Sequence, residues 1–358
     1  MSVAPHSSNA TGAIGVVARG LLLVGASVVA ALFCAEIVLR LLRLSPAEGV
    51  GTVSARQYEE VPGILAPNQR VIDIQKPALP YSVRIDSLGF RGVDFPRRKP
   101  PGQFRVVMIG DSFVYGDFVD DSVTFPVQLE QRLRRACPDA RVINAGLGGT
   151  TIVDEAFMMQ RTLSLDPDLV ILVYTESDIE DLASPQTAWQ ALAANRLRKS
   201  RFPLSVLYPL FRNTALWNLG LKVVATKREQ RDIAKRHQAA ARDSVGTIDR
   251  LRDRYGAALV SFRDTLMSHG VRFVFAMYPS WLELQSQSAD LTWVARFASA
   301  HAINGVNLLP ALQAAHLQAT RLYLIPRDGH PSPSGISIAA DDLAERMVRG
   351  PVAAACGH

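Results

Sequence analysis

The chain has 358 residues, of which 48% are hydrophobic and 20% are charged. These proportions are ordinary for a globular protein and exclude a mostly disordered, collagen-like or polytopic membrane chain. The length predicts one large domain with additions, or two domains. A net charge of +6 over this length does not by itself indicate nucleic-acid binding.

The cysteines are too few for a disulfide scaffold, and none lies in a C-x-x-C pair or beside a histidine cluster. They are Cys34, Cys137 and Cys356. We therefore expect neither a zinc site nor thiol redox chemistry.

The first predicted element is an apolar helix from Gly20 to Leu39, interrupted by one charge, Glu36. At about 1.5 Å per residue it matches the thickness of the hydrocarbon layer, about 30 Å. A cleaved signal peptide or a buried core helix are the alternatives. The apolar run is longer than a secretory h-region and lacks a clean A-x-A site, which favours a membrane anchor.

The flanking charges do not decide the orientation of this helix, because Arg19 precedes it and Arg40 and Arg43 follow it. A short tail before a large hydrophilic domain is typical of a signal anchor. We therefore expect a single-pass protein of the bacterial inner membrane with a periplasmic or otherwise extracytoplasmic domain. A domain that faces the cytoplasm is the alternative.

After residue 100, apolar runs of strand length alternate with amphipathic helical stretches such as 126–135 and 246–267. Strands rich in Val, Ile and Leu that alternate with helices predict a parallel sheet covered on both faces, in a three-layer α/β domain. The predicted strands are 105–109, 141–143, 169–174, 271–276 and 322–325.

One segment interrupts this alternation. Between Leu182 and Arg228 there is no acidic residue, whereas eight basic residues and five aromatic residues are interleaved. This pattern is typical of contact with an anionic lipid surface or an acidic polymer. A helical cap with core rings and solvated charges is the alternative. The basic residues are Arg196, Arg198, Lys199, Arg201, Arg212, Lys222, Lys227 and Arg228, and the aromatic residues are Trp189, Phe202, Tyr208, Phe211 and Trp217.

These patterns predict five parts of the chain. They are an N-terminal tail (1–18), an anchor (19–43), a Pro- and Gly-rich stalk and lead-in segment (44–103), an α/β domain (104–350) with a helical insertion (183–245), and a C-terminal tail (351–358).

Two short motifs are typical of acyl transfer by an activated serine. Ser112 follows the predicted strand 105–109 within Gly110-Asp111-Ser112, where the turn exposes a nucleophile at the carboxyl edge of the sheet. An N-cap role is its alternative. Near the other end, Asp328 and His330 follow the run 322–325, and a histidine oriented by a carboxylate can take the proton of a serine.

Two further turns follow predicted strands. In the first, residues 144–150, Gly149 allows a backbone N–H to approach a developing oxyanion closely. The second is Thr175-Glu176-Ser177-Asp178. The first turn matches neither G-x-G-x-x-G nor the P-loop pattern, so we expect no nucleotide cofactor there.

These four blocks, in this order, resemble the SGNH (GDSL-type) hydrolase family over about residues 104–180 and 320–348. The resemblance implies a flavodoxin-like α/β/α fold, Ser112 as nucleophile, and Asp328 with His330 as acid and base. It also implies oxyanion donors at Ser112, Gly149 and Ser177, with no metal or organic cofactor. The segment 86–92, DSLGFRG, looks like the lead-in of membrane-anchored bacterial members.

Two departures from the family pattern concern the predicted site. Ser177 stands where the family offers asparagine, and loss of such a donor outright costs about 2.7–4 kcal/mol in the transition state. One residue, Gly329, separates Asp328 from His330 where two are commoner.

The resulting hypothesis is a membrane-tethered serine esterase or O-acyltransferase. Its expected substrate is an acyl ester, such as an acetyl ester, of an extracytoplasmic glycan or lipid. The alternative is a non-catalytic glycan-binding or polysaccharide-assembly protein on the same scaffold. Neither hypothesis involves nucleic acid.

Overall fold

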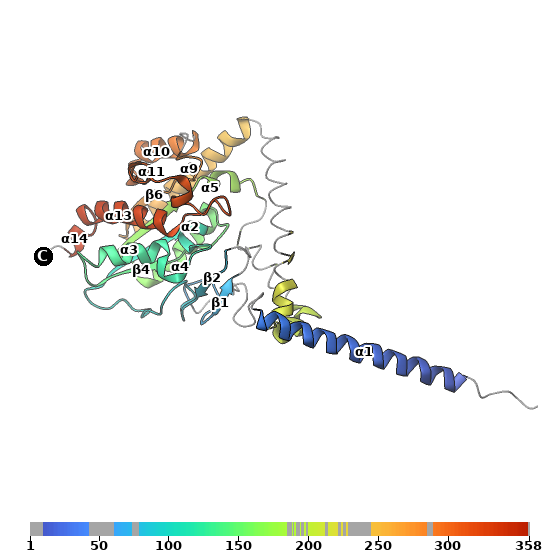
Figure 1. Cartoon of the computed structure of the whole chain (residues 1–358). Helices are drawn as coiled ribbons and strands as arrows, with labels where there is room; N and C mark the ends of the chain where they lie inside the picture. Colours follow the sequence, from blue (N-terminus) through green and yellow to red (C-terminus); the bar gives the residue numbers. More distant parts are fainter. Residues whose placement is uncertain are drawn as a thin grey trace, which may run out of the picture.

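A computed structural model describes most of the chain (Figure 1). The described ranges are 10–42, 61–73, 79–184, 200–211, 214–220, 245–284 and 289–356, with isolated positions between 188 and 227.

The centre of the structure is a five-stranded parallel sheet in the order β4-β3-β5-β6-β7. This is the flavodoxin-like order 2-1-3-4-5 of a doubly wound sheet, in which sites lie at the carboxyl ends of the strands. The predicted fold class is therefore confirmed. The strands are β3 (Phe104–Gly110), β4 (Ala140–Asn144), β5 (Leu169–Tyr174), β6 (Arg272–Met277) and β7 (Gly305–Asn307).

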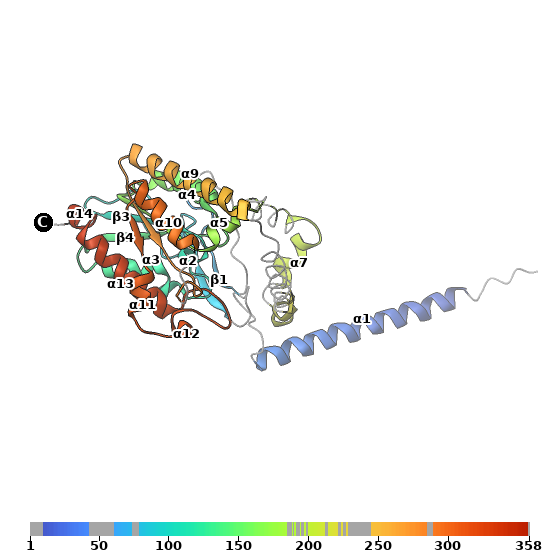
Figure 2. The ribbon, with the colours of Figure 1, turned by 90° about the horizontal axis from the view of Figure 1, so that it is seen from above.

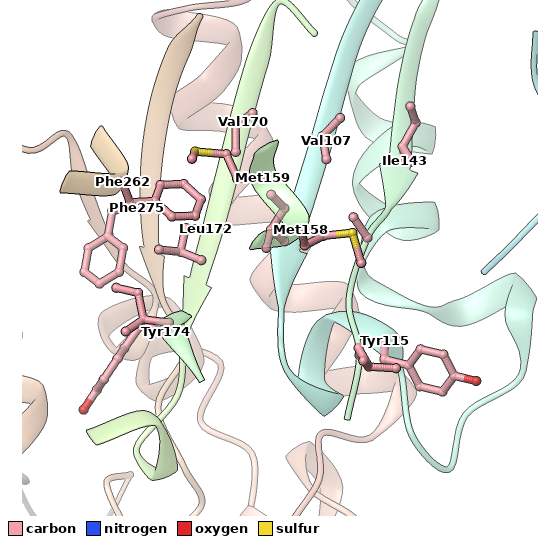
Figure 3. Close-up of a cluster of buried hydrophobic side chains, with 14 of the residues drawn as sticks. Val107, Tyr115, Ile143, Met158, Met159, Val170, Leu172, Tyr174, Phe262 and Phe275 are labelled. Atoms are coloured by element: carbon pink, nitrogen blue, oxygen red, sulfur yellow. The ribbon is translucent and has the colours of Figure 1, made fainter. Parts of the chain in front are cut away.

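The two faces of the sheet carry alternate residues of each strand, as the period of two requires. On one face, Val107, Leu172 and Phe275 pack with residues of α4 (Ile152–Thr162) and α9 (Val245–Ser268), including Met158 and Phe262. Figure 3 shows these side chains in the layer between sheet and helices. Residues of α3 (Phe125–Leu133) and α13 (Pro333–Arg349) cover the other face and pack against Val106, Met108 and Ile171, among others.

The helices of this domain lie along the chain between and after the strands. They are α2 (Ser112–Tyr115), α3 (Phe125–Leu133), α4 (Ile152–Thr162), α5 (Ser177–Asp181), α9 (Val245–Ser268), α10 (Ala289–Ala300), α11 (Leu309–Ala314), α12 (Ala319–Leu322), α13 (Pro333–Arg349) and α14 (Ala353–Cys356).

The prediction of a strand at 322–325 is wrong. Leu322 ends α12, and Tyr323 forms only a single bridge with Pro331. The fifth strand is instead β7, whose three residues are too short to give a periodic signal. Apolar runs of four residues cannot be assigned by periodicity alone. Tyr323 is buried in the core, where its hydroxyl donates to Pro279 O at 2.5 Å.

The described part of the lead-in segment packs against the α/β domain. It forms an antiparallel pair of strands, β1 (Arg70–Asp73) and β2 (Tyr81–Arg84). Tyr81, Val83 and Phe90 belong to the same buried cluster as β3 and β5. This segment is therefore part of the core that supports the sheet.

A disulfide joins Cys137 to Cys356, with a Cα–Cα separation of 5.5 Å. It connects the turn before β4 to α14, at the edge of the sheet opposite the strand ends that carry Ser112. The cysteine spacing gave no signal for this pair, because the two residues are 219 positions apart.

The N-terminal helix α1 (Ala10–Leu41) extends away from the α/β domain (Figures 1 and 2). Within Ala18–Leu41, an 18-residue stretch has a mean hydropathy of 2.5, and none of that stretch is buried inside the structure. Its length and composition suit a membrane anchor or a signal sequence.

Candidate active site

Ser112 stands on a tight turn between β3 and α2. Asp111 precedes the helix and accepts a hydrogen bond from the N–H of Phe113 at 2.8 Å, which caps the first turn. The turn needs glycine at position 110, because a Cβ there would lie 2.6 Å from a methyl of Val114 and 3.1 Å from the carbonyl of Val173. The strand, the glycine and the cap together fix the position of the Ser112 hydroxyl.

The structure brings Ser112, His330 and Asp328 together. The Ser112 hydroxyl lies 2.7 Å from His330 Nε2, and His330 Nδ1 contacts Asp328 Oδ1 in a short hydrogen bond. The carboxylate can only accept, so Nδ1 carries the proton and donates, whereas Nε2 accepts from the serine. This tautomer is the one that a general base for Ser112 requires.

The loop between α12 and α13 holds the imidazole in place. The N–H of His330 donates to Asp328 Oδ1 at 2.7 Å, and the His330 carbonyl accepts from the N–H of Leu324 at 2.9 Å. The rings of Phe113 and Phe118 lie with centroids 5.3 Å and 5.0 Å from the imidazole. Asp328 and His330 therefore reach the carboxyl edge of the sheet from a loop and not from a strand end.

Opposing effects act on the pKa of His330. Burial lowers it, but the hydrogen bond to Asp328 and the negative charges of Asp117, Asp328 and Asp111 raise it, and the net pKa lies above the ordinary value of 6.5. The imidazole is thus neutral only on the alkaline side of this raised pKa.

Asp117 is a site residue that the sequence analysis missed. Its Oδ1 accepts a hydrogen bond from the Tyr81 hydroxyl at 2.7 Å. Its Oδ2 lies 3.0 Å from where a Cβ on Gly148 would stand, and that same point is 3.8 Å from the Cβ of Ser112. Asp117 occupies a loop after a four-residue helix, where no strand or motif marks its approach to the serine.

The predicted oxyanion donors differ in their placement. Ser112 begins α2, and the first N–H groups of a helix have no intrahelical partner. Gly149 adopts a φ of +75°, which favours glycine, in the turn that passes beside Ser112. Ser177 is the exposed first residue of α5, and within the described ranges its side chain has no hydrogen bond to Ser112 or His330.

Behind the nucleophile turn lies a buried group of carboxyls that the sequence analysis did not interpret. The Thr175 hydroxyl is 2.9 Å from Asp111 Oδ2 and 3.1 Å from Asp178 Oδ1, but it has only one proton to donate. A protonated carboxyl in this pair would donate to the Thr175 oxygen, and the Thr175 hydroxyl would then donate to the other carboxyl. Burial raises the pKa of both Asp111 and Asp178, in agreement with this arrangement.

Arg91 ties the lead-in segment to the loop that follows Ser112. Its buried guanidinium donates to the carbonyls of Tyr115, Gly116 and Val119 at 2.7–2.9 Å and pairs with Asp121 at 2.8 Å. This loop carries Asp117 and Phe118 to the imidazole. The motif at 86–92 thus contributes a residue that positions the site.

No known family model and no curated protein matches this chain. Among solved structures, it is similar to a two-domain esterase active on acetylated mannans (TM-score 0.42, 14% identity, 70% of this chain and 50% of that one). It is also similar to a protein assigned to the lipolytic G-D-S-L family from Desulfitobacterium hafniense (TM-score 0.41, 13% identity, 68% of this chain and 99% of that one). A third similar structure is a catalytic mutant of an acetylxylan esterase from Geobacillus stearothermophilus (TM-score 0.39, 16% identity, 68% of this chain and 93% of that one). Likenesses this distant carry no argument about chemistry, which rests on the residues of this chain.

Proposed function

We propose that this protein is a serine-dependent hydrolase or acyltransferase of SGNH type that acts on acyl esters. The observation that carries the proposal is the 2.7 Å separation between Ser112 Oγ and His330 Nε2, with Asp328 on the other ring nitrogen. A serine adjacent to a base, with the base oriented by a third group, is the general arrangement of an activated nucleophile. An N-cap role alone would not require the imidazole.

In the proposed mechanism, Ser112 attacks the ester carbonyl while His330 takes its proton. Asp328 stabilises the imidazolium, and the N–H groups of Ser112 and Gly149 stabilise the oxyanion, with help from Ser177. The imidazolium then returns the proton to the leaving alcohol, which leaves an acyl group on Ser112. Water, activated by His330, or a hydroxyl of an acceptor takes up that acyl group.

The rings of Phe113 and Phe118 place apolar surface beside the imidazole of His330. The substrate that we propose is a short acyl ester, such as an acetyl ester, of a larger glycan or lipid.

We propose that α1 tethers the enzyme to the bacterial inner membrane, with the domain on the extracytoplasmic side. The Cys137–Cys356 disulfide supports this side, because such bonds persist in oxidising compartments and are rare in the cytosol.

The test is turnover of p-nitrophenyl acetate by the full-length chain in detergent. We expect Ser112→Ala and His330→Ala each to lower kcat/KM by roughly 10³-fold or more. Ser164→Ala is the control, because Ser164 is exposed in the turn before β5, at the other edge of the sheet. Wild-type rates in both site variants would contradict the proposal. Added acceptor sugar distinguishes transfer from hydrolysis.

A further inference from the structure

The last turns of α1 are bonded to the segment that interrupts the α/β pattern. Glu36 accepts hydrogen bonds from the backbone N–H groups of Ala215 and Leu216 at 2.9 Å and 2.8 Å, and it pairs with Arg40 at 2.6 Å. Leu39 and Ala215 are buried nearby. The single carboxylate of this apolar helix thus caps the helical residues 215–220 and holds them against α1.

This contact fixes the depth of the segment relative to α1. The apolar stretch Ala18–Leu41 has 24 residues, and at 1.5 Å per residue it is about 36 Å long. Glu36 lies five residues, or about 7.5 Å, before its end. If α1 spans a bilayer, residues 214–220 lie at the boundary between acyl chains and headgroups, because the hydrocarbon layer is only about 30 Å thick.

The neighbouring helix α7 (Leu204–Phe211) has no charged residue and exposes large apolar side chains. Both views place it beside the C-terminal end of α1 (Figures 1 and 2). Leu210 is 65% exposed, and similar side chains continue before and after it in the chain. These exposed side chains are Leu197, Phe202, Val206, Leu210, Phe211, Val223 and Val224.

We propose that the exposed apolar side chains of α7 and its described neighbours, from Leu197 to Val224, form a second membrane contact in the interface of the leaflet that holds the C-terminal end of α1. The exposed apolar side chains enter the acyl boundary, while the basic residues, such as the exposed Arg201 and Lys227, meet anionic headgroups. A single helix lets the domain rotate about the helix axis, whereas a second contact fixes the orientation of the active site above the membrane. This inference rests on the proposed tether.

A bilayer fits this surface better than a protein partner does. The exposed apolar side chains lie beside α1, which itself exposes Leu, Val and Phe side chains along its length. The acyl chains of one bilayer can therefore cover the apolar surfaces of both α1 and this segment. The interleaved cations match negatively charged lipid headgroups.

The test measures depth in the full-length protein, carrying Cys34→Ser and reconstituted in vesicles of phosphatidylcholine with phosphatidylglycerol. An environment-sensitive fluorophore is attached to Leu210→Cys, and lipids with doxyl groups at known depths quench it. Val29→Cys in α1 is the positive reference. Met267→Cys in α9 is the matched control, because Met267 is 66% exposed and Leu210 is 65% exposed.

We expect the label at 210 to show blue-shifted emission and strong quenching by shallow doxyl groups, while the label at 267 shows neither. A second result would be that the label at 29 is quenched, while the label at 210 behaves like the label at 267. This result would overturn the second membrane contact and indicate a protein partner or a second copy of the chain. If the label at 29 is not quenched either, the tether itself fails, and this inference fails with it.

Discussion

The α/β domain and the region formed by α1 and α7 differ in where their large apolar side chains lie. In the domain, apolar residues face the sheet, and buried polar groups such as Arg91 and Asp111 have partners within the chain. In α1 and α7, large apolar side chains face outward. The first region therefore covers its apolar side chains with its own elements, whereas the second needs an apolar surrounding that the described residues do not supply.

The largest expected effect is on catalysis and belongs to the domain alone. Asp328→Asn removes the charge that stabilises the imidazolium and allows the wrong tautomer, so kcat should fall roughly 10²–10⁴-fold. Ester turnover and binding to vesicles are measured together. Near-normal kcat in this variant would contradict the role of Asp328. Loss of membrane binding would show that catalysis and membrane contact are not independent.

The next effect is on stability, at the junction of the lead-in segment with the domain. Arg91→Leu leaves several buried carbonyls without a donor and Asp121 without its partner, so the free energy of unfolding should fall by roughly 3–5 kcal/mol. Arg84→Leu is the matched control, because its pair with Asp94 is exposed and is worth about 0–1 kcal/mol. Equal denaturation midpoints for the two variants would contradict a stabilising role of the Arg91 contacts.

The disulfide should contribute less to the free energy of unfolding than the Arg91 contacts do, because it constrains mainly the unfolded chain. Cys356→Ser should lower the free energy of unfolding by about 2–4 kcal/mol and leave turnover unchanged, since the bond lies at the opposite edge of the sheet. Thermal unfolding with and without reductant measures this. The exposed, free Cys34 provides the control Cys34→Ser, which should not respond.

The smallest expected effect is a shift in the pH dependence of turnover. Activity needs neutral His330, so kcat/KM should rise with pH through the raised pKa of this imidazole. Asp117→Asn removes one of the negative charges that raise that pKa, so the acid limb should move to lower pH. Asp120→Asn, in the same loop, should leave the limb in place. An unmoved limb in the Asp117 variant would show that its charge does not act on His330.

Much of the α/β domain was predictable, because buried parallel strands leave continuous apolar runs such as Leu169–Tyr174. The placement of Ser112 followed from its position after such a run. His330 was found for a partly wrong reason, because 322–325 is not a strand and the residue reaches the site from a loop.

Other parts of the site left no sequence signal. Asp117 lies near Ser112 because of a backbone turn and the Tyr81 hydrogen bond, neither of which has a periodicity. The role of Arg91 depends on carbonyls that lie 24–28 positions away in the chain. Contacts of this kind depend on how loops pack, which local residue patterns do not determine.

The most direct test of the central claim is a fluorophosphonate probe applied to the full-length protein, with the adduct located by mass spectrometry. Because such probes react with activated serines, we predict an adduct on Ser112 that is lost in His330→Ala. A folded wild-type chain without this adduct, or an equal adduct in His330→Ala, would contradict activation by His330. The first of these results would favour a non-catalytic glycan-binding role for the domain.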